Sequence, residues 1–258
     1  MRRFFSIGVF AIIISCISLS SCKKVWDEIK HHPDGAADNC HVTQIADSWY
    51  NADYEGYVYD TARYVYNNNG DPVRVNRSAS RDVYISDQAF VYDNQYRLLA
   101  FVDDIPSYGH ITKVGFAWHT YTYVNASTIK DSLFVYPSGD YTISYKPTSY
   151  DHVEVSTLTL DSWGRIIKEQ KGDGTEIVYS YDANGNLIKP GVNYTNKTNI
   201  RQTHKTWMFI DRDYSVNQPE GDAIAFNGNK LPTKFNNTYR INFGGYSYFQ
   251  GMVTYSCK

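Results

Sequence analysis

One local pattern recurs along this chain and restricts the folds open to it. Two hydrophobic residues one position apart are followed by Asp or Asn, then by a short polar turn, and then by a hydrophobic residue that starts a new strand. A strand that ends in a tight turn and resumes at once is typical of a β-hairpin. The pattern occurs at 64–70, 90–98, 158–166, 179–187 and, one residue shorter, 224–231.

The side chains of this turn explain why it is tight. An Asp or Asn at its first position can accept hydrogen bonds from backbone N–H groups two or three residues further on. A glycine three residues after it can take the positive φ that other residues resist. The turn residues assigned on this basis are Asp93, Asp161, Gly164, Asp182 and Gly185. Asp161 and Asp182 are 21 residues apart, which suits a hairpin repeat.

Composition and periodicity favour the same fold class. Aromatic residues make up 16% of the chain and Tyr alone supplies 24 residues, which suits half-buried pleated surfaces. Hydrophobic residues occupy every second position in many segments, for example Tyr57 and Tyr59. We therefore predict an all-β fold, an antiparallel hairpin meander that forms a curved sheet or incomplete barrel. One short helix is expected near 203–213, as a plug over one end of the sheet.

The N-terminal segment indicates where in the cell the protein is located. Two arginines precede an apolar run over 4–17 that is too short to span a membrane. The sequence Leu-Ser-Ser-Cys at 19–22 resembles a bacterial lipobox, which implies a signal peptide over 1–21 and a lipid on Cys22. An ordinary signal peptide with an incidental cysteine is the alternative.

This resemblance divides the chain into three parts. Residues 1–21 are expected to be the signal peptide, 22–45 the lipidated cysteine and a polar tether, and 46–258 the β domain. The membrane is then a partner through Cys22. No Asp stands directly after that cysteine, which favours the outer membrane over the inner one. The periplasmic face and the cell surface both stay open.

Two cysteines are left for the domain once Cys16 has gone with the signal peptide and Cys22 carries the lipid. Cys40 and Cys257 lie near the two ends of the mature chain, in an oxidising compartment. A disulfide between them and a pair of free thiols are equally open, because the sequence does not supply the Cα separation.

The sequence contains no catalytic constellation. The net charge is −2 and there is no run of Lys or Arg, so nucleic acid is not expected as a partner. No serine has the Gly-x-Ser-x-Gly setting of a hydrolase nucleophile. Asp211 and Asp213 begin a run of alternating oxygen side chains, but Val216 stands where a calcium loop needs Gly. We expect no enzymatic activity, no cofactor and no metal site.

Aromatic side chains are the one positive sign of ligand binding. Trp49, Trp118 and Trp163 could stack on sugar rings if they are exposed together, and Trp163 lies in a turn where exposure is expected. The alternative is that these rings fill the interior of the sheet and pair across strands. We favour this second interpretation.

Two of the turns resemble a known repeat. Tyr-x-Tyr-Asp-x-x-Gly-Asn-Leu at 179–187 and Asp-x-x-Gly-Arg-Ile at 161–166 are similar to the tyrosine–aspartate (YD, or Rhs-type) repeat. Together with the lipobox, they make the chain resemble uncharacterised Bacteroidetes outer-membrane lipoproteins, among them a domain of unknown function with a porin-like fold. The resemblance implies a repeated β-hairpin scaffold and no activity.

The function expected from these observations is that of a lipid-anchored cell-envelope protein. It would act as a non-catalytic scaffold or protein-interaction module, with an envelope protein as its partner. The alternative is a surface lipoprotein that binds a glycan through exposed Trp and Tyr side chains.

Overall fold

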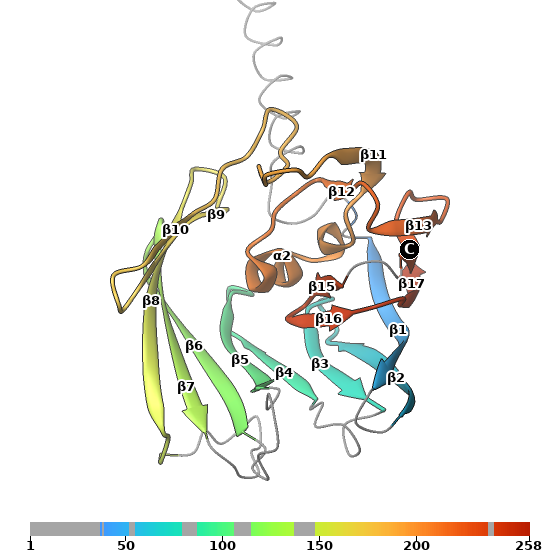
Figure 1. The fold of residues 1–258 in the computed structure, drawn as a ribbon. Helices are drawn as coiled ribbons and strands as arrows, with labels where there is room; N and C mark the ends of the chain where they lie inside the picture. Colours follow the sequence, from blue (N-terminus) through green and yellow to red (C-terminus); the bar gives the residue numbers. More distant parts are fainter. Residues whose placement is uncertain are drawn as a thin grey trace, which may run out of the picture.

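A large β-sheet dominates the computed structural model, which describes residues 37, 39–51, 55–78, 87–105, 115–136, 148–236 and 240–258 (Figure 1). Its elements, in chain order, are β1 (Cys40–Asn51), β2 (Gly56–Tyr66), β3 (Pro72–Arg77), β4 (Gln88–Tyr92), β5 (Leu98–Ile105), β6 (Gly115–Asn125), β7 (Thr128–Tyr136), β8 (His152–Leu160), β9 (Ile166–Lys171), β10 (Glu176–Val178), β11 (Tyr194–Thr198), the 3-10 helix η1 (Ile200–Thr203), α2 (Lys205–Asp211), β12 (Asn217–Pro219), β13 (Ala223–Phe226), β14 (Pro232–Phe235), β15 (Ile241–Phe243), β16 (Tyr246–Tyr248) and β17 (Met252–Cys257).

Thirteen strands form one antiparallel sheet in the order β10-β9-β8-β7-β6-β5-β4-β3-β2-β1-β17-β14-β13. From β1 to β10 each strand pairs with the next one along the chain, so the predicted hairpin meander is confirmed. The chain then returns to place β17 beside β1. Among the described residues the sheet ends at β10 and at β13 and does not close.

The predicted turn forms at all five places in the same way. In each, the side-chain oxygen of the first residue accepts two backbone N–H groups; for Asp161 these belong to Trp163 and Arg165, both at 2.9 Å. The backbone donors therefore lie two and four residues further along the chain, not two and three. The residue three positions on has positive φ every time, and it is Gly70, Gly164, Gly185, Tyr96 or Lys230.

The sheet curves around α2, as Figure 1 shows. The predicted helix is confirmed but shorter, because His204 is extended and separates η1 from α2. His204 caps α2 by accepting the Thr206 N–H on its ring. The helix stops at Arg212, which takes a left-handed conformation with φ 54°.

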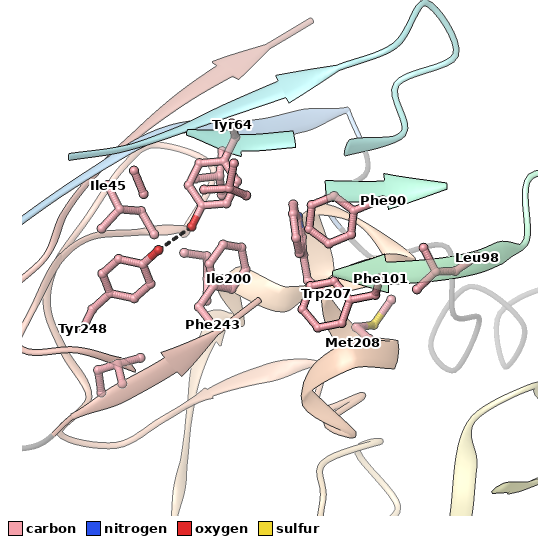
Figure 2. Close-up of a cluster of buried hydrophobic side chains, with 14 of the residues drawn as sticks. Ile45, Tyr64, Phe90, Leu98, Phe101, Ile200, Trp207, Met208, Phe243 and Tyr248 are labelled. Atoms are coloured by element: carbon pink, nitrogen blue, oxygen red, sulfur yellow. Dashed lines mark hydrogen bonds between the residues drawn. The ribbon is translucent and has the colours of Figure 1, made fainter. Parts of the chain in front are cut away.

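The main core lies between α2 and the concave face of the sheet (Figure 2). The fully buried Trp207 meets Tyr64 and Phe90 edge to face, with ring centroids 5.5 and 5.6 Å apart. Tyr64 also shares a buried hydrogen bond of 2.8 Å with the hydroxyl of Tyr248. The helix therefore covers the apolar interior that a curved sheet would otherwise expose.

The sheet begins earlier than the sequence indicated. The tether was expected to run to residue 45, but β1 starts at Cys40, and Val42 and Ile45 are fully buried. Thr43 and Gln44 hid this strand, because a register shift between Val42 and Gln44 puts two polar residues in a row between the buried positions and breaks the alternation. The β domain therefore includes at least 40–45.

Candidate functional site

Three exposed tyrosines gather on the outward face of the β1–β2 hairpin. Tyr50, Tyr57 and Tyr59 leave 57%, 63% and 74% of their surface exposed. Tyr50 is the register partner of Tyr57, and their rings meet edge to face with centroids 5.7 Å apart. Tyr59 is two positions from Tyr57, so strand alternation places it on the same side. We call these three residues the tyrosine patch.

The cross-strand neighbours of the tyrosine patch are small or carry a hydroxyl. Ser48 pairs with Tyr59, and the next pair on that face is Ala46 with Thr61. Exposed aromatic rings beside hydroxyl groups offer both a stacking surface and hydrogen-bonding partners.

The other face of the hairpin is fixed to the body of the protein. Asp47 is buried and accepts the backbone N–H groups of Phe249 at 3.0 Å and Gln250 at 2.9 Å. Burial raises the pKa of the Asp47 carboxyl, against the opposing effect of these hydrogen bonds. On the patch side, Gln250 also donates to the Ser48 hydroxyl at 2.8 Å. The backbone beneath the tyrosine patch is therefore held in one register.

The three tryptophans considered as a glycan platform are not brought together. Trp118 in β6 is only 5% exposed, and four strands separate β6 from β1. Trp49 in β1 is half-buried and stacks on Phe249 with centroids 6.2 Å apart. Trp163 in the β8–β9 turn is also half-buried, so the exposure expected for it is not found. Alternation in a sequence predicts a shared face but not which face is covered.

The acidic residues at the end of α2 and just after it form ion pairs with cationic side chains. Arg201 donates from Nε to the Asp211 carboxylate at 2.7 Å, and Lys189 donates to Asp213 at 2.8 Å. Although burial acts to raise it, Arg201 and Lys189 lower the pKa of Asp213 to about 2. The Ser215 hydroxyl also donates to Asp213, at 2.5 Å. These carboxylates hold the end of α2 in place, which explains the calcium-like spacing as a structural ion-pair network.

A second buried network lies on the concave face of β6 and β7. One Asp131 oxygen is 2.9 Å from Nδ1 of His119, and the other accepts Nη2 of Arg212 at 3.0 Å. Arg212 is also 3.6 Å from the Glu169 carboxylate. Both oxygens of Asp131 are thus engaged, and the carboxylate ties the end of α2 to the sheet. Among the described residues no group of three or more His, Cys, Asp or Glu side chains is placed to hold a metal.

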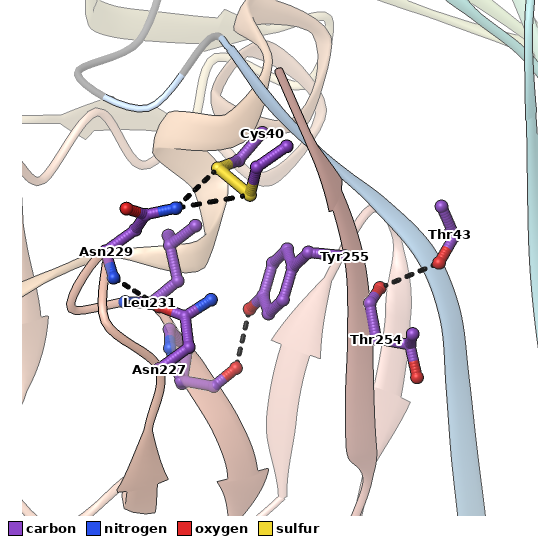
Figure 3. Close-up of a disulfide and its surroundings, with 9 residues drawn as sticks. Cys40, Thr43, Asn227, Asn229, Leu231, Thr254 and Tyr255 are labelled. Atoms are coloured by element: carbon purple, nitrogen blue, oxygen red, sulfur yellow. Dashed lines mark hydrogen bonds between the residues drawn. A yellow bond between two sulfur atoms is a disulfide. The ribbon is translucent and has the colours of Figure 1, made fainter.

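Cys40 and Cys257 are joined in a disulfide (Figure 3). They are register partners at the ends of β1 and β17, which settles the pairing that the sequence left open. Asn229 donates from its side chain toward both sulfurs, at 3.2 and 3.3 Å. Cys22 and the segment 1–36 lie outside the described residues, so the lipid anchor stays a prediction. Among the described residues no helix has the length and apolar character needed to cross a bilayer.

Comparison with known proteins gives little beyond this. No family model matches the chain, and no curated protein matches it. A solved structure with some likeness is that of a porin-like protein from Bacteroides uniformis, at 11% sequence identity and a TM-score of 0.31. The match covers 84% of this chain and 98% of that one.

Proposed function

We propose that this protein is a lipid-anchored protein of the outer membrane that binds another envelope component without catalysis. The observation that carries the proposal is the tyrosine patch, in which Tyr50, Tyr57 and Tyr59 are exposed side by side on a hairpin held rigid from behind. Tyrosine is enriched at protein contacts, because it contributes a large apolar area and loses little conformational entropy when it is held. The lipobox-like sequence at 19–22 supports the anchor.

The placement of the buried charges supports binding over catalysis. Asp131, Asp211 and Asp213 each contact a cationic side chain that also fastens α2 or its flanking segments to the fold. Carboxylates with these partners stabilise a structure by keeping buried charges neutralised. A protein partner is our first choice, and a neutral glycan, which would stack on the same rings, is the second.

Cross-linking in intact cells tests the proposal. We expect a cross-linked species with the wild-type chain that is lost in the double variant Tyr57→Ala/Tyr59→Ala. The matched control is Val124→Ala/Val178→Ala, which removes two side chains that are 61% and 63% exposed on other strands. Loss of the cross-link in both variants, or in neither, would count against the tyrosine patch.

A glycan array with the purified protein separates the two partners. Saturable binding of a neutral glycan that disappears in Tyr57→Ala/Tyr59→Ala, with no protein cross-link in cells, would favour the glycan. Circular dichroism and the thermal midpoint should be unchanged in the variant, since both side chains face the solvent.

A further inference from the structure

Two adjoining hollows lie where the repeat turns meet the start of α2. The smaller has a volume of about 140 Å³ and the larger about 430 Å³. Tyr96 and Lys205 line both of them. Tyr96 comes from the β4–β5 turn and Lys205 is the first residue of α2, so the sheet and the helix build the pair of hollows together.

The smaller hollow is apolar at its base and cationic at its rim. Leu98 and Ile129 from the sheet are 4% and 1% exposed and face Phe209 of α2 across it. Arg97 lines the rim, with its guanidinium 4.4 Å from the centroid of the Tyr123 ring and its Nε bonded to Asp93 at 2.7 Å. An apolar hollow of this volume is large enough for one benzene-sized group.

The larger hollow is lined by polar side chains with an excess of positive charge. Lys205 and Lys258 line it together with His41 and His204, and Asp71 is the acidic residue among them. The Asp71 carboxylate already has its own partners, the His204 ring at 3.5 Å and the Asn67 amide at 3.2 Å. In the described part of the chain neither lysine ammonium has a carboxylate oxygen within 4.0 Å, although the charge of Lys205 contributes to lowering the pKa of Asp71, after the larger effect of the His204 hydrogen bond.

Tyr96 lines both hollows and has a left-handed backbone conformation that bulky residues usually avoid. Its φ is 59°, at the turn position where three of the five repeats have glycine. A bulky residue is uncommon in this region, because its Cβ approaches the backbone closely. The Tyr96 side chain is 48% exposed, so packing of the ring does little to offset that backbone strain.

We propose that these hollows bind a small organic anion, a carboxylate that carries an aromatic or branched aliphatic group. The apolar group fills the smaller hollow against Leu98, Ile129 and Phe209. The carboxylate lies at the opening beside the Lys205 ammonium, where the larger, positively charged hollow begins. The Tyr96 ring packs against the ligand between the two. This site is separate from the tyrosine patch and does not depend on the proposed function.

Calorimetric titration of the purified full-length protein with phenylacetate tests the proposal. We expect saturable binding that weakens about tenfold or more in Lys205→Met, because a charge-assisted contact is lost while the aliphatic stem is kept. Benzyl alcohol, which has the ring but no charge, should bind weakly and equally to both proteins. The matched control is Lys130→Met, which removes an exposed lysine of β7 that lines neither hollow.

The variant Tyr96→Gly separates a role in binding from a role in folding. It gives the turn the residue that suits its positive φ, so its thermal midpoint should rise while phenylacetate binding falls. No saturable phenylacetate binding, equal binding by Lys205→Met, or inorganic phosphate binding as tightly as phenylacetate would overturn the proposal. Unchanged phenylacetate binding in Tyr57→Ala/Tyr59→Ala would show that the two sites are independent.

Discussion

Gly251 lies at a place in the core that has no room for a Cβ atom. A Cβ at this position would lie 2.8 Å from Cγ2 of Ile45 and 3.1 Å from Cδ2 of Phe235. Both neighbours are fully buried, so they have little room to move. The glycine therefore allows β17 to approach the core side of β1.

We predict that Gly251→Ala lowers the free energy of unfolding by about 1–3 kcal/mol through overpacking. The matched control is Gly228→Ala, because a Cβ there meets nothing within 4 Å and the position lacks a positive φ. Urea denaturation of both variants measures the difference. Equal loss in the two would mean that close packing at Gly251 is not the cause.

Asp213 makes stability depend on pH in the acidic range. Its pKa of about 2 lies below the value of about 3.9 expected for an unfolded chain. The charged carboxylate therefore stabilises the fold above about pH 4, and this contribution of about 2–3 kcal/mol is lost as the pH falls from 4 to 2.

The partner lysine provides the test of that pH dependence. Lys189→Met removes one of the charges that lower the Asp213 pKa, so the stability of this variant should fall less steeply between pH 4 and pH 2 than that of the wild type. Urea denaturation at stepped pH gives both slopes. Parallel curves would show that Lys189 does not set the pKa of Asp213.

At the scale of the element, the repeat turn depends on one oxygen atom. Oδ1 of Asp161 accepts two backbone N–H groups, while Oδ2 accepts Nε of Arg165 at 2.9 Å. Asn serves in the same position at Asn67 and Asn227 and accepts the same two N–H groups. The backbone acceptor is therefore the common requirement, and the ion pair is an addition.

We predict that Asp161→Ala costs about 1–2 kcal/mol of stability, because two backbone donors lose their acceptor. Asp161→Asn should cost less than half as much, since it keeps Oδ1 and loses only the charge contact with Arg165. Thermal denaturation of the pair measures both effects. Equal costs would assign the stabilisation to the ion pair and not to the turn.

The turns were the most predictable elements, and the two turns without glycine show what the sequence pattern could not predict. Asp161 with Gly164 and Asp182 with Gly185 carry the whole signal locally, in residues that have few other uses. The pattern also predicted the turns that contain Tyr96 and Lys230, but it did not predict that these residues, which resist positive φ, would adopt it. The site beside Tyr96 was not predicted, because the turns and the helix that line it lie far apart in sequence.

At the scale of the whole molecule, the pairing of β1 with β17 could not be foreseen. It joins the two ends of the described domain, and the sequence offered only the two cysteines as a sign of it, with a disulfide and a pair of free thiols left equally open. The sequence also did not indicate which face of the sheet is exposed. Alternation placed Tyr57 and Tyr59 on one face, but it did not show that this face lies opposite the core. The open sheet with its helix followed from composition and turns alone.

We predict that Cys40→Ser/Cys257→Ser lowers the free energy of unfolding by up to about 5 kcal/mol, because the disulfide closes a loop with a sequence separation of 217. Ser at both positions is close to Cys in size but cannot form the bridge. Urea denaturation of oxidised wild type, reduced wild type and the variant gives the value. A variant as stable as the oxidised protein would mean that the β1–β17 ladder alone fixes the ends.

The disulfide also decides how the molecule carries load. β1 runs for 12 residues from Cys40 at one end to the hairpin of the tyrosine patch at the other. If the proposed partner binds the tyrosine patch and the proposed lipid anchor precedes Cys40, tension between the two would pass along this single strand, parallel to the backbone. At Cys40 the sulfur bridge shares that tension with the last strand, so β17 cannot be peeled from β1 one hydrogen bond at a time. A force applied to the chain before Cys40 would therefore be borne by two covalently linked strands and not by the hydrogen bonds between them.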